Sequence, residues 1–284
     1  MVAPSPIQPI QPHLDTKTVT VPAGFSGDGL EVWLTAGRIQ RSAKFYADGE
    51  LFGEHVGYLS VFEARVPVTS ASASSFELRI EVNATRKQGV DGLQGEEDLE
   101  TDGTGLGGWG GLGGHVNLES RASAGWIESP HVQQVISEDF RSASLFVDVE
   151  IGGLNSSRRP GCQITTVVKL NGTVVARPAA ATCNASGPTC SVPGFAIGGG
   201  AIKLWSPDTP TQYTVVISLF DTRGRVLDTQ VVTIGLRKLE RVGYHFKLNG
   251  GWLWLHGYGD DAIYPWTVSP PLNFSFYRTR LAYP

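Results

Sequence analysis

Acidic side chains crowd one loop of this sequence, between Lys87 and Gly105. Its carboxylates are Glu96, Glu97, Asp98 and Asp102, which lie among glycines. Oxygen donors of this kind bind calcium or the hydroxyl groups of a sugar. Their spacing does not match an EF-hand calcium loop, and charge clusters are usually solvated. We therefore expect a solvated surface insertion, with calcium or sugar binding as the alternative.

Three cysteines could carry redox chemistry, and all lie in one stretch, at Cys162, Cys183 and Cys190. Two interpretations stay open. One disulfide with a remaining thiol would fit an oxidising compartment, and three buried thiols would fit any compartment. The spacing lacks the paired CxxC pattern of zinc sites.

Other catalytic signals are weak. Four histidines are scattered without metal-ligand spacing and are expected to be structural: His115, His131, His245 and His256. A Gly-x-Ser-x-Gly elbow, which would support a serine nucleophile, does not occur. We expect neither a metal nor another cofactor.

The composition indicates many short strands rather than helices. The 284 residues suggest about two domains. They include 35 glycines and 17 prolines, which break helices and favour turns. A net charge of -4 without a basic patch argues against a nucleic-acid partner. No apolar run reaches about 18 residues, so we expect no membrane helix.

Alternating apolar and polar residues predict strands in both halves. In the first half they cover Thr16 to Pro22, Gly29 to Thr35, Ser42 to Tyr46, Glu50 to Gly53, Phe62 to Val68 and Phe76 to Val82. In the second half they cover Ser144 to Ile151, Gln163 to Leu170, Thr173 to Ala176, Ala201 to Trp205, Tyr213 to Phe220 and Val226 to Ile234. The dipeptides Asp48-Gly49 and Asn171-Gly172 predict tight hairpin turns. About seven short strands in the second half suggest an immunoglobulin-like sandwich.

Segments late in the chain carry a family resemblance. They are Leu204 to Val215, Asp221-Thr222-Arg223-Gly224, Phe246-Lys247-Leu248-Asn249-Gly250 and Leu253 to Gly259. In this order they resemble the end of the immunoglobulin-like domain of glycoside hydrolase family 2, running into the first strand of its catalytic barrel. That family includes β-galactosidases, β-glucuronidases and β-mannosidases.

Two earlier segments resemble the same family. Ala43 to Phe62 is similar to its sugar-binding β-sandwich. Gly107 to Glu119 resembles its Trp-Gly-Gly-Ile-x-Arg-x-Val-x-Leu signature, with Gly114 and His115 where the family has Arg.

The resemblance implies an all-β fold. A jelly-roll-like sugar-binding sandwich (residues 1–129) would precede an immunoglobulin-like sandwich (130–238). Residues 239–284 would hold the first strand of a truncated (β/α)8 barrel, at Trp252 to His256, with any helix short and near Leu272 to Leu281. In that arrangement we expect the tail, Arg241 to Pro284, to be the least stable part. The competing expectation is that it docks on the second sandwich and buries its tryptophans.

The resemblance also implies which residues would contact sugar. Glycosidic cleavage needs two carboxylates about 5 to 5.5 Å apart for retention, or wider for inversion. The family supplies them from deep inside its barrel, so we expect no catalytic residue in this chain. The loop after the first barrel strand lies near the sugar in the family, and here it holds Asp260, Asp261 and Trp266. The carboxylates would hydrogen-bond hydroxyls and the indole would stack on a pyranose; the alternative is a turn cap and a core residue.

Three functions therefore stand side by side. The chain is expected to be the non-catalytic β-sandwich part of a family 2 exo-glycosidase, with carbohydrate as its partner. The alternatives are a stand-alone carbohydrate-binding or scaffold module and a cell-adhesion sandwich. Five Asn-x-Ser/Thr sequons favour secretion, whereas the N-terminus lacks the apolar core of a signal peptide. The sequons begin at Asn83, Asn155, Asn171, Asn184 and Asn273.

Overall fold

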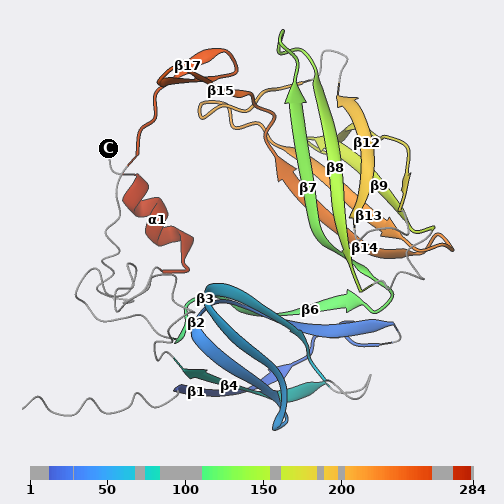
Figure 1. Cartoon of the computed structure of the whole chain (residues 1–284), viewed down its shortest axis with the longest axis vertical. Helices are drawn as coiled ribbons and strands as arrows, with labels where there is room; N and C mark the ends of the chain where they lie inside the picture. Colours follow the sequence, from blue (N-terminus) through green and yellow to red (C-terminus); the bar gives the residue numbers. More distant parts are fainter. Residues whose placement is uncertain are drawn as a thin grey trace, which may run out of the picture. The chain divides into compact units, whose positions relative to one another are not determined.

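The computed structural model of the protein is almost entirely β-structure (Figure 1). It describes residues 13–27, 29–67, 74–83, 111–153, 161–183, 189–197, 202–257 and 271–282. The chain forms two compact units. The first comprises Met1–Arg121 and Tyr258–Pro284, and the second comprises Ala122–Gly257. The expected all-β fold is confirmed, and the single described helix, α1 (Phe274–Leu281), lies where a short helix was expected.

The first unit is built on one antiparallel sheet. Its strands are β1 (His13–Thr20), β2 (Leu30–Ala47), β3 (Glu50–Arg65), β4 (Ser75–Asn83), β5 (Gly111–Leu112) and β6 (Val116–Ala122). The strand order is β1-β4-β2-β3, and both β5 and β6 also pair with β2. In Figure 1 the long strands β2 and β3 curl over this unit.

Two pairs of expected strands are continuous in the structure. Gly29 to Thr35 and Ser42 to Tyr46 both belong to β2, and Glu50 to Gly53 and Phe62 to Val68 largely belong to β3. The register between β2 and β3 shifts between Ala36 and Ile39, where Arg38 has a φ of 53°. Such bulges bend a strand without ending it, and a sequence pattern with a period of two loses its phase there.

The first core is centred on aromatic side chains. Phe45 is fully buried, and its ring stacks on that of Phe62 with centroids 3.9 Å apart. The predicted turn between β2 and β3 is confirmed, since Asp48 and Gly49 have φ values of 48° and 84°. These values are typical of a type I′ hairpin turn.

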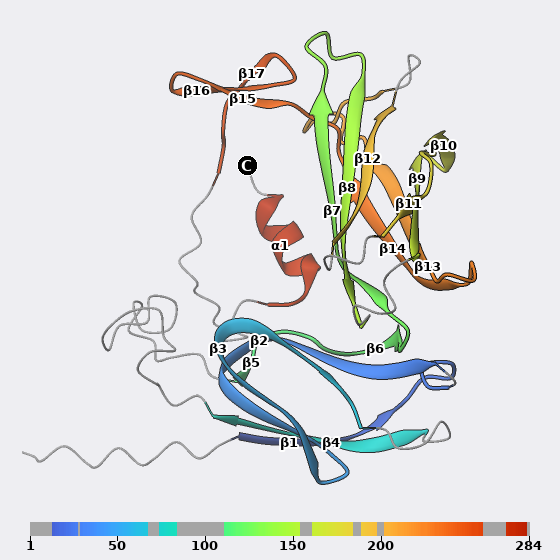
Figure 2. The ribbon, with the colours of Figure 1, turned by 45° about the vertical axis from the view of Figure 1, so that its right-hand side comes forward.

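The second unit is a sandwich of two sheets (Figure 2). One sheet has the order β12-β8-β7, and the other has the order β10-β9-β13-β14, with β11 also pairing with β9. The strands are β7 (Trp126–Ile136), β8 (Ala143–Gly152), β9 (Gln163–Leu170), β10 (Thr173–Ala176), β11 (Ala181–Thr182), β12 (Thr189–Ile197), β13 (Tyr213–Phe220) and β14 (Val226–Ile234). This is the expected immunoglobulin-like arrangement.

Alternation of buried and less buried side chains along the strands explains the core of the second unit. Every second residue of β13 is fully buried, namely Tyr213, Val215, Ile217 and Leu219. Leu145, Val147 and Val149 of β8 lie in the same core. The predicted bounds of β9, β10, β13 and β14 are confirmed.

One predicted strand is wrong. Of the predicted strand Ala201 to Trp205, the described residues Ile202 to Trp205 are not a strand; the Trp205 N–H donates one backbone hydrogen bond, to the Leu236 carbonyl at 2.7 Å. One bond does not make a ladder. A side-chain hydrogen bond holds the segment instead: the Lys203 N–H donates to the hydroxyl of buried Tyr213 at 2.6 Å. A tyrosine that bonds back to upstream backbone is typical of immunoglobulin-like folds.

The end of the second unit is a separate small sheet. Its strands are β15 (Leu239–Val242), β16 (His245–Leu248) and β17 (Gly251–Leu253), in antiparallel order. The segment expected as a lone barrel strand, Trp252 to His256, therefore begins as a paired strand and leaves the sheet after Leu253. The Asn249-Gly250 turn, with φ values of 50° and 80°, directs β17 back along β16. The backbone N–H and C=O groups of β17 therefore pair with β16.

Candidate functional site

The sugar-contact residues expected from the sequence lie outside the described residues. Asp260, Asp261 and Trp266 fall within residues 258–270, and the acidic loop with Glu96, Glu97, Asp98 and Asp102 falls within 84–110. Their roles remain predictions. The last described strands before Asp260 in the sequence form the sheet β15–β17.

That sheet presents a cluster that we call the tryptophan face, composed of His245, Lys247, Trp252 and Trp254. The imidazole of His245 lies 5.8 Å from the Trp252 ring and 6.1 Å from the Trp254 ring, edge-on to both. The Lys247 ammonium lies 4.6 Å from the centroid of the Trp252 ring. The pairing of Lys247 with Trp252 across β16 and β17 produces this grouping.

The tryptophan face is accessible. Trp252 is 59% exposed and Trp254 is 73% exposed. Exposed indoles beside polar groups can stack on a sugar ring or bury against a partner, and large exposed apolar groups mark interaction sites. Sequence analysis placed these tryptophans only in the tail and did not predict that they lie together. The Asn249-Gly250 hairpin turn was the feature from which this grouping could have been predicted.

A second candidate lies in the first unit. A cavity of about 710 Å³ opens along β1, between β4 and the β5–β6 segment. Its lining mixes core side chains (Leu34, Leu78, Ile80 and Leu118) with polar ones (Asp15, Thr16, Lys17, Thr18 and Asn117). The volume suits a small ligand, and apolar walls with a few polar groups are typical of ligand sites. Sequence reasoning missed this site, because Asp15 and Lys17 look like ordinary residues of a solvated strand.

Two carboxylates share one arginine on another part of the first unit. Arg121 contacts Glu119 at 2.7 Å and Glu63 at 3.1 Å, and its guanidinium lies 4.7 Å from the Trp33 ring. Burial alone would lower the pKa of Arg121, but the hydrogen bonds to Glu119 and Glu63 outweigh it and raise that pKa. The shared guanidinium links Glu63 of β3 to Glu119 of β6, so this group stabilises the contact between these two strands.

Two carboxyl groups in the second unit, Asp139 and Asp221, have lowered pKa values. A hydrogen bond from the Ser137 hydroxyl lowers the pKa of Asp139, and the backbone N–H of Arg225 lowers the pKa of Asp221. A general acid in glycoside hydrolysis needs a raised pKa. Asp139 and Asp221 therefore stabilise turns, and neither is suited to donate a proton at neutral pH.

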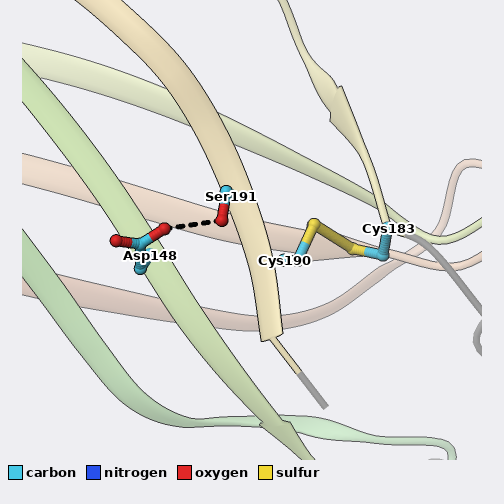
Figure 3. Close-up of a disulfide and its surroundings, with 4 residues drawn as sticks. All are labelled: Asp148, Cys183, Cys190 and Ser191. Atoms are coloured by element: carbon cyan, nitrogen blue, oxygen red, sulfur yellow. Dashed lines mark hydrogen bonds between the residues drawn. A yellow bond between two sulfur atoms is a disulfide. The ribbon is translucent and has the colours of Figure 1, made fainter. Parts of the chain in front are cut away.

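The cysteines form one disulfide, Cys183–Cys190, which ties the end of β11 to the start of β12 (Figure 3). Beside it, the Ser191 hydroxyl donates to Asp148 at 2.6 Å across β12 and β8. Cys162 keeps its thiol and is buried, and burial raises the pKa of that thiol. Of the two interpretations, the disulfide with a remaining thiol is confirmed, and a thiol of raised pKa is a poor nucleophile.

Within the parts of the chain that the structure describes, no three histidine, cysteine, aspartate or glutamate side chains converge as metal ligands. None of the described helical structure is long and apolar enough to cross a membrane.

Comparison with protein families gives a match that covers the sandwich of the second unit. Residues 126–237 match the model of glycosyl hydrolases family 2. A β-galactosidase of Psychromonas ingrahamii is 38% identical over 61 residues, which are 22% of this chain and 6% of that protein. A β-galactosidase of Vibrio vulnificus is 35% identical over 63 residues, with the same shares.

Solved structures share the fold over most of the chain. A β-glucuronidase from Ruminococcus gnavus in complex with D-glucuronic acid has a TM-score of 0.70 at 16% identity, covering 94% of this chain and 44% of that one. The β-glucuronidase of Bifidobacterium dentium complexed with coumarin-3-O-glucuronide has a TM-score of 0.65 at 22% identity, covering 84% and 41%. The chain thus spans less than half of these structures and a small fraction of the matched β-galactosidases.

Proposed function

We propose that this chain, whose residues 126–237 match the model of glycosyl hydrolases family 2, forms the non-catalytic β-sandwich part of a family 2 exo-glycosidase. The observation that carries this proposal is the place of the family match. It runs from the first residue of β7 to just beyond β14, the whole immunoglobulin-like sandwich.

The proposal assigns each part of the chain a task. The β-structure before β7 would be the sugar-binding-like domain, and the sandwich from β7 to about Lys238 would be a rigid spacer. Residues from Leu239 onward would lead toward a catalytic barrel. The tryptophan face supports the last assignment, because indoles left largely exposed in this chain would be covered by further structure.

In this proposal Asp260, Asp261 and Trp266 contact the sugar. They follow the tryptophan face within a dozen residues, so the same end of the chain carries both. Carboxylates accept hydrogen bonds from sugar hydroxyls, and an indole provides a flat apolar face for the ring. Fluorescence titration of the full chain with galactose and with glucuronic acid measures this contact. We expect the spectral shift to disappear in W266A and to weaken in D260N and D261N, whereas D208N, at an exposed turn carboxylate, should match the wild type.

The activity test is direct. We expect no turnover by this chain of nitrophenyl β-galactoside, β-glucuronide or β-mannoside, because Asp139 and Asp221 have lowered pKa values and Arg121 binds both Glu63 and Glu119. Turnover above a buffer blank that persists through repurification, and that is lost in D260N or D261N, would overturn the non-catalytic assignment.

A second candidate function is a stand-alone carbohydrate-binding module. The 710 Å³ cavity of the first unit favours it, since a small sugar fits that volume and Asp15, Lys17 and Asn117 offer hydrogen-bond partners. Calorimetric titration separates the two candidates. Sugar binding abolished by D15A and K17A but unchanged in W266A would favour the module, and the opposite pattern would favour the enzyme part.

A further inference from the structure

We propose that Asn171 is an acceptor for an N-linked glycan, at the tip of the β9–β10 hairpin. The sequence there is Asn171-Gly172-Thr173, which has the hydroxyl residue that the acceptor motif requires. The proposal concerns the second unit alone and does not depend on the function proposed above.

The hairpin turn presents the acceptor to solvent. Asn171 and Gly172 have φ values of 49° and 81°, so the chain reverses within these two residues. Asn171, Gly172 and Thr173 are all exposed, and so is Val174, at 46%. β10 is the last strand in the order β10-β9-β13-β14, so a bulky group at this tip meets no further strand of the sheet.

The other described sequons are less favourable. Asn83 is half-buried at the end of β4, where its carbonyl accepts a hydrogen bond of 3.2 Å from Ser42. Asn273 caps α1, and its side-chain oxygen accepts from both the backbone N–H and the hydroxyl of Ser275, at 2.9 and 2.8 Å. A glycan there would have to form on a carboxamide that is engaged in holding a helix end.

An independent observation supports the compartment that the modification needs. The disulfide Cys183–Cys190 lies in the same unit, next to β11, which pairs with β9. Disulfides form and persist where the surroundings are oxidising, which includes the endoplasmic reticulum lumen. Oxidation of these cysteines and glycosylation of Asn171 would therefore occur in one place.

The chemistry is a substitution that oligosaccharyltransferase catalyses. The side-chain nitrogen Nδ2 of Asn171 forms a bond to the first sugar carbon of a lipid-linked oligosaccharide. The bond between that carbon and the lipid diphosphate breaks, the diphosphate leaves with the electron pair, and Nδ2 loses one proton. Nothing is oxidised or reduced.

Cell-free translation with endoplasmic reticulum microsomes tests the proposal. The full chain is fused to a cleavable secretory leader, and protease-protected products are compared with and without endoglycosidase H. We expect the wild type to carry one more glycan than N171Q. T173S should keep that glycan and T173A should lose it, although both change only the third residue of the sequon.

The chain supplies its own matched control. Asn249-Gly250 forms a turn with nearly the same φ values, but Gly251 follows it, so mass spectrometry should find Asn249 unmodified. The variants N155Q and N184Q report whether the microsomes are active on this chain. Identical band patterns for the wild type, N171Q and T173A would overturn the proposal, whether or not other sites are occupied.

Discussion

The hydroxyl of Tyr213 illustrates how one atom organises the second sandwich. The ring is fully buried at the start of β13, and its oxygen accepts the backbone N–H of Lys203 at 2.6 Å. That bond fixes the approach to β13, a segment that has no ladder of its own. We expect Y213F to lower the free energy of unfolding by about 1–3 kcal/mol, because it leaves a partly buried donor without its partner.

Urea unfolding of Y213F against the wild type measures this loss. The matched control is Y244F, since Tyr244 is 99% exposed and the same hydroxyl is removed without burial. The unfolding free energy of Y244F should stay within about 0.5 kcal/mol of the wild-type value. Equal losses in both variants would show that the Lys203 bond is not the cause.

Asp221 gives the unfolding free energy a defined pH dependence. Its carboxylate accepts the N–H groups of Arg223 and Arg225 and the guanidinium of Arg225, all at 2.8–2.9 Å. The backbone N–H of Arg225 is the main cause of its lowered pKa. A folded pKa below the unfolded value of about 3.9 means that the carboxylate stabilises above that value, and that this contribution is lost as the pH falls through the folded pKa.

We therefore expect the unfolding free energy of the wild type to fall more steeply than that of D221N below about pH 4, and in parallel with it near neutrality. Urea unfolding across a pH series measures both slopes. D208N, at an exposed carboxylate in another turn, should follow the wild type throughout. Parallel curves for wild type and D221N down to acid pH would contradict the role given to Asp221.

At the scale of elements, prolines hid two strands from sequence analysis. Pro130 lies within β7 and Pro193 within β12, and proline normally argues against a strand. Both strands are edges of the sheet β12-β8-β7, where a missing N–H costs least. The register between β12 and β8 also shifts between Val192 and Phe195, so Pro193 sits in a bulge. Both prolines are tolerated because β7 and β12 lie at the edges of their sheet. A local sequence pattern does not show which strand will be an edge.

The disulfide fastens one of those edge strands. Cys183 and Cys190 are seven residues apart and buried, so the bridge closes a short loop. We expect it to contribute about 2–3 kcal/mol, from the loop-entropy relation for a loop of this length. A reductant should lower the melting temperature of the wild type.

The double variant C183S/C190S provides the control for that measurement. Its melting temperature should not respond to the reductant, because Cys162 alone remains. A similar response in both proteins would assign the effect to something other than this bridge.

For the whole molecule, the sequence predicted the lineage and the second sandwich well. The alternation in Tyr213 to Phe220 and the Asn171-Gly172 turn are strong local signals, and both match the structure. The candidate site was predicted less completely. Asp260 and Trp266 were named through resemblance, whereas the cavity along β1 depends on which distant strands face Asp15 and Lys17.

The tail should be the first part of the molecule to yield to protease. None of the residues of β15, β16 and β17 is fully buried, and such segments open at low free-energy cost. We expect early cuts between Leu239 and Tyr264 and a resistant core that ends near Arg237. Limited proteolysis followed by mass spectrometry checks this.

One side chain should set the rate of that cleavage. The amide of Asn249 donates to the Trp205 carbonyl and accepts from the Lys238 N–H, both at 3.0 Å, and so joins the small sheet to the sandwich. N249A should speed the early cuts, whereas V231A, at an exposed position of β14, should not. Resistance through Tyr283 in every variant would instead indicate that the tail is firmly docked.

The pairing of β13 with β9 determines which sheet can form first while the chain is synthesised on the ribosome. Every described strand of the first sheet is made once Ala122 has been added, so that sheet can form while synthesis continues. The second sandwich cannot form so early. Leu145 and Val147 of β8 are made well before Tyr213–Phe220, the strand that joins β9 to β14 in the facing sheet. At roughly 5–20 residues per second the nascent chain shows this apolar strip for several seconds. That interval is when a chaperone would be needed most.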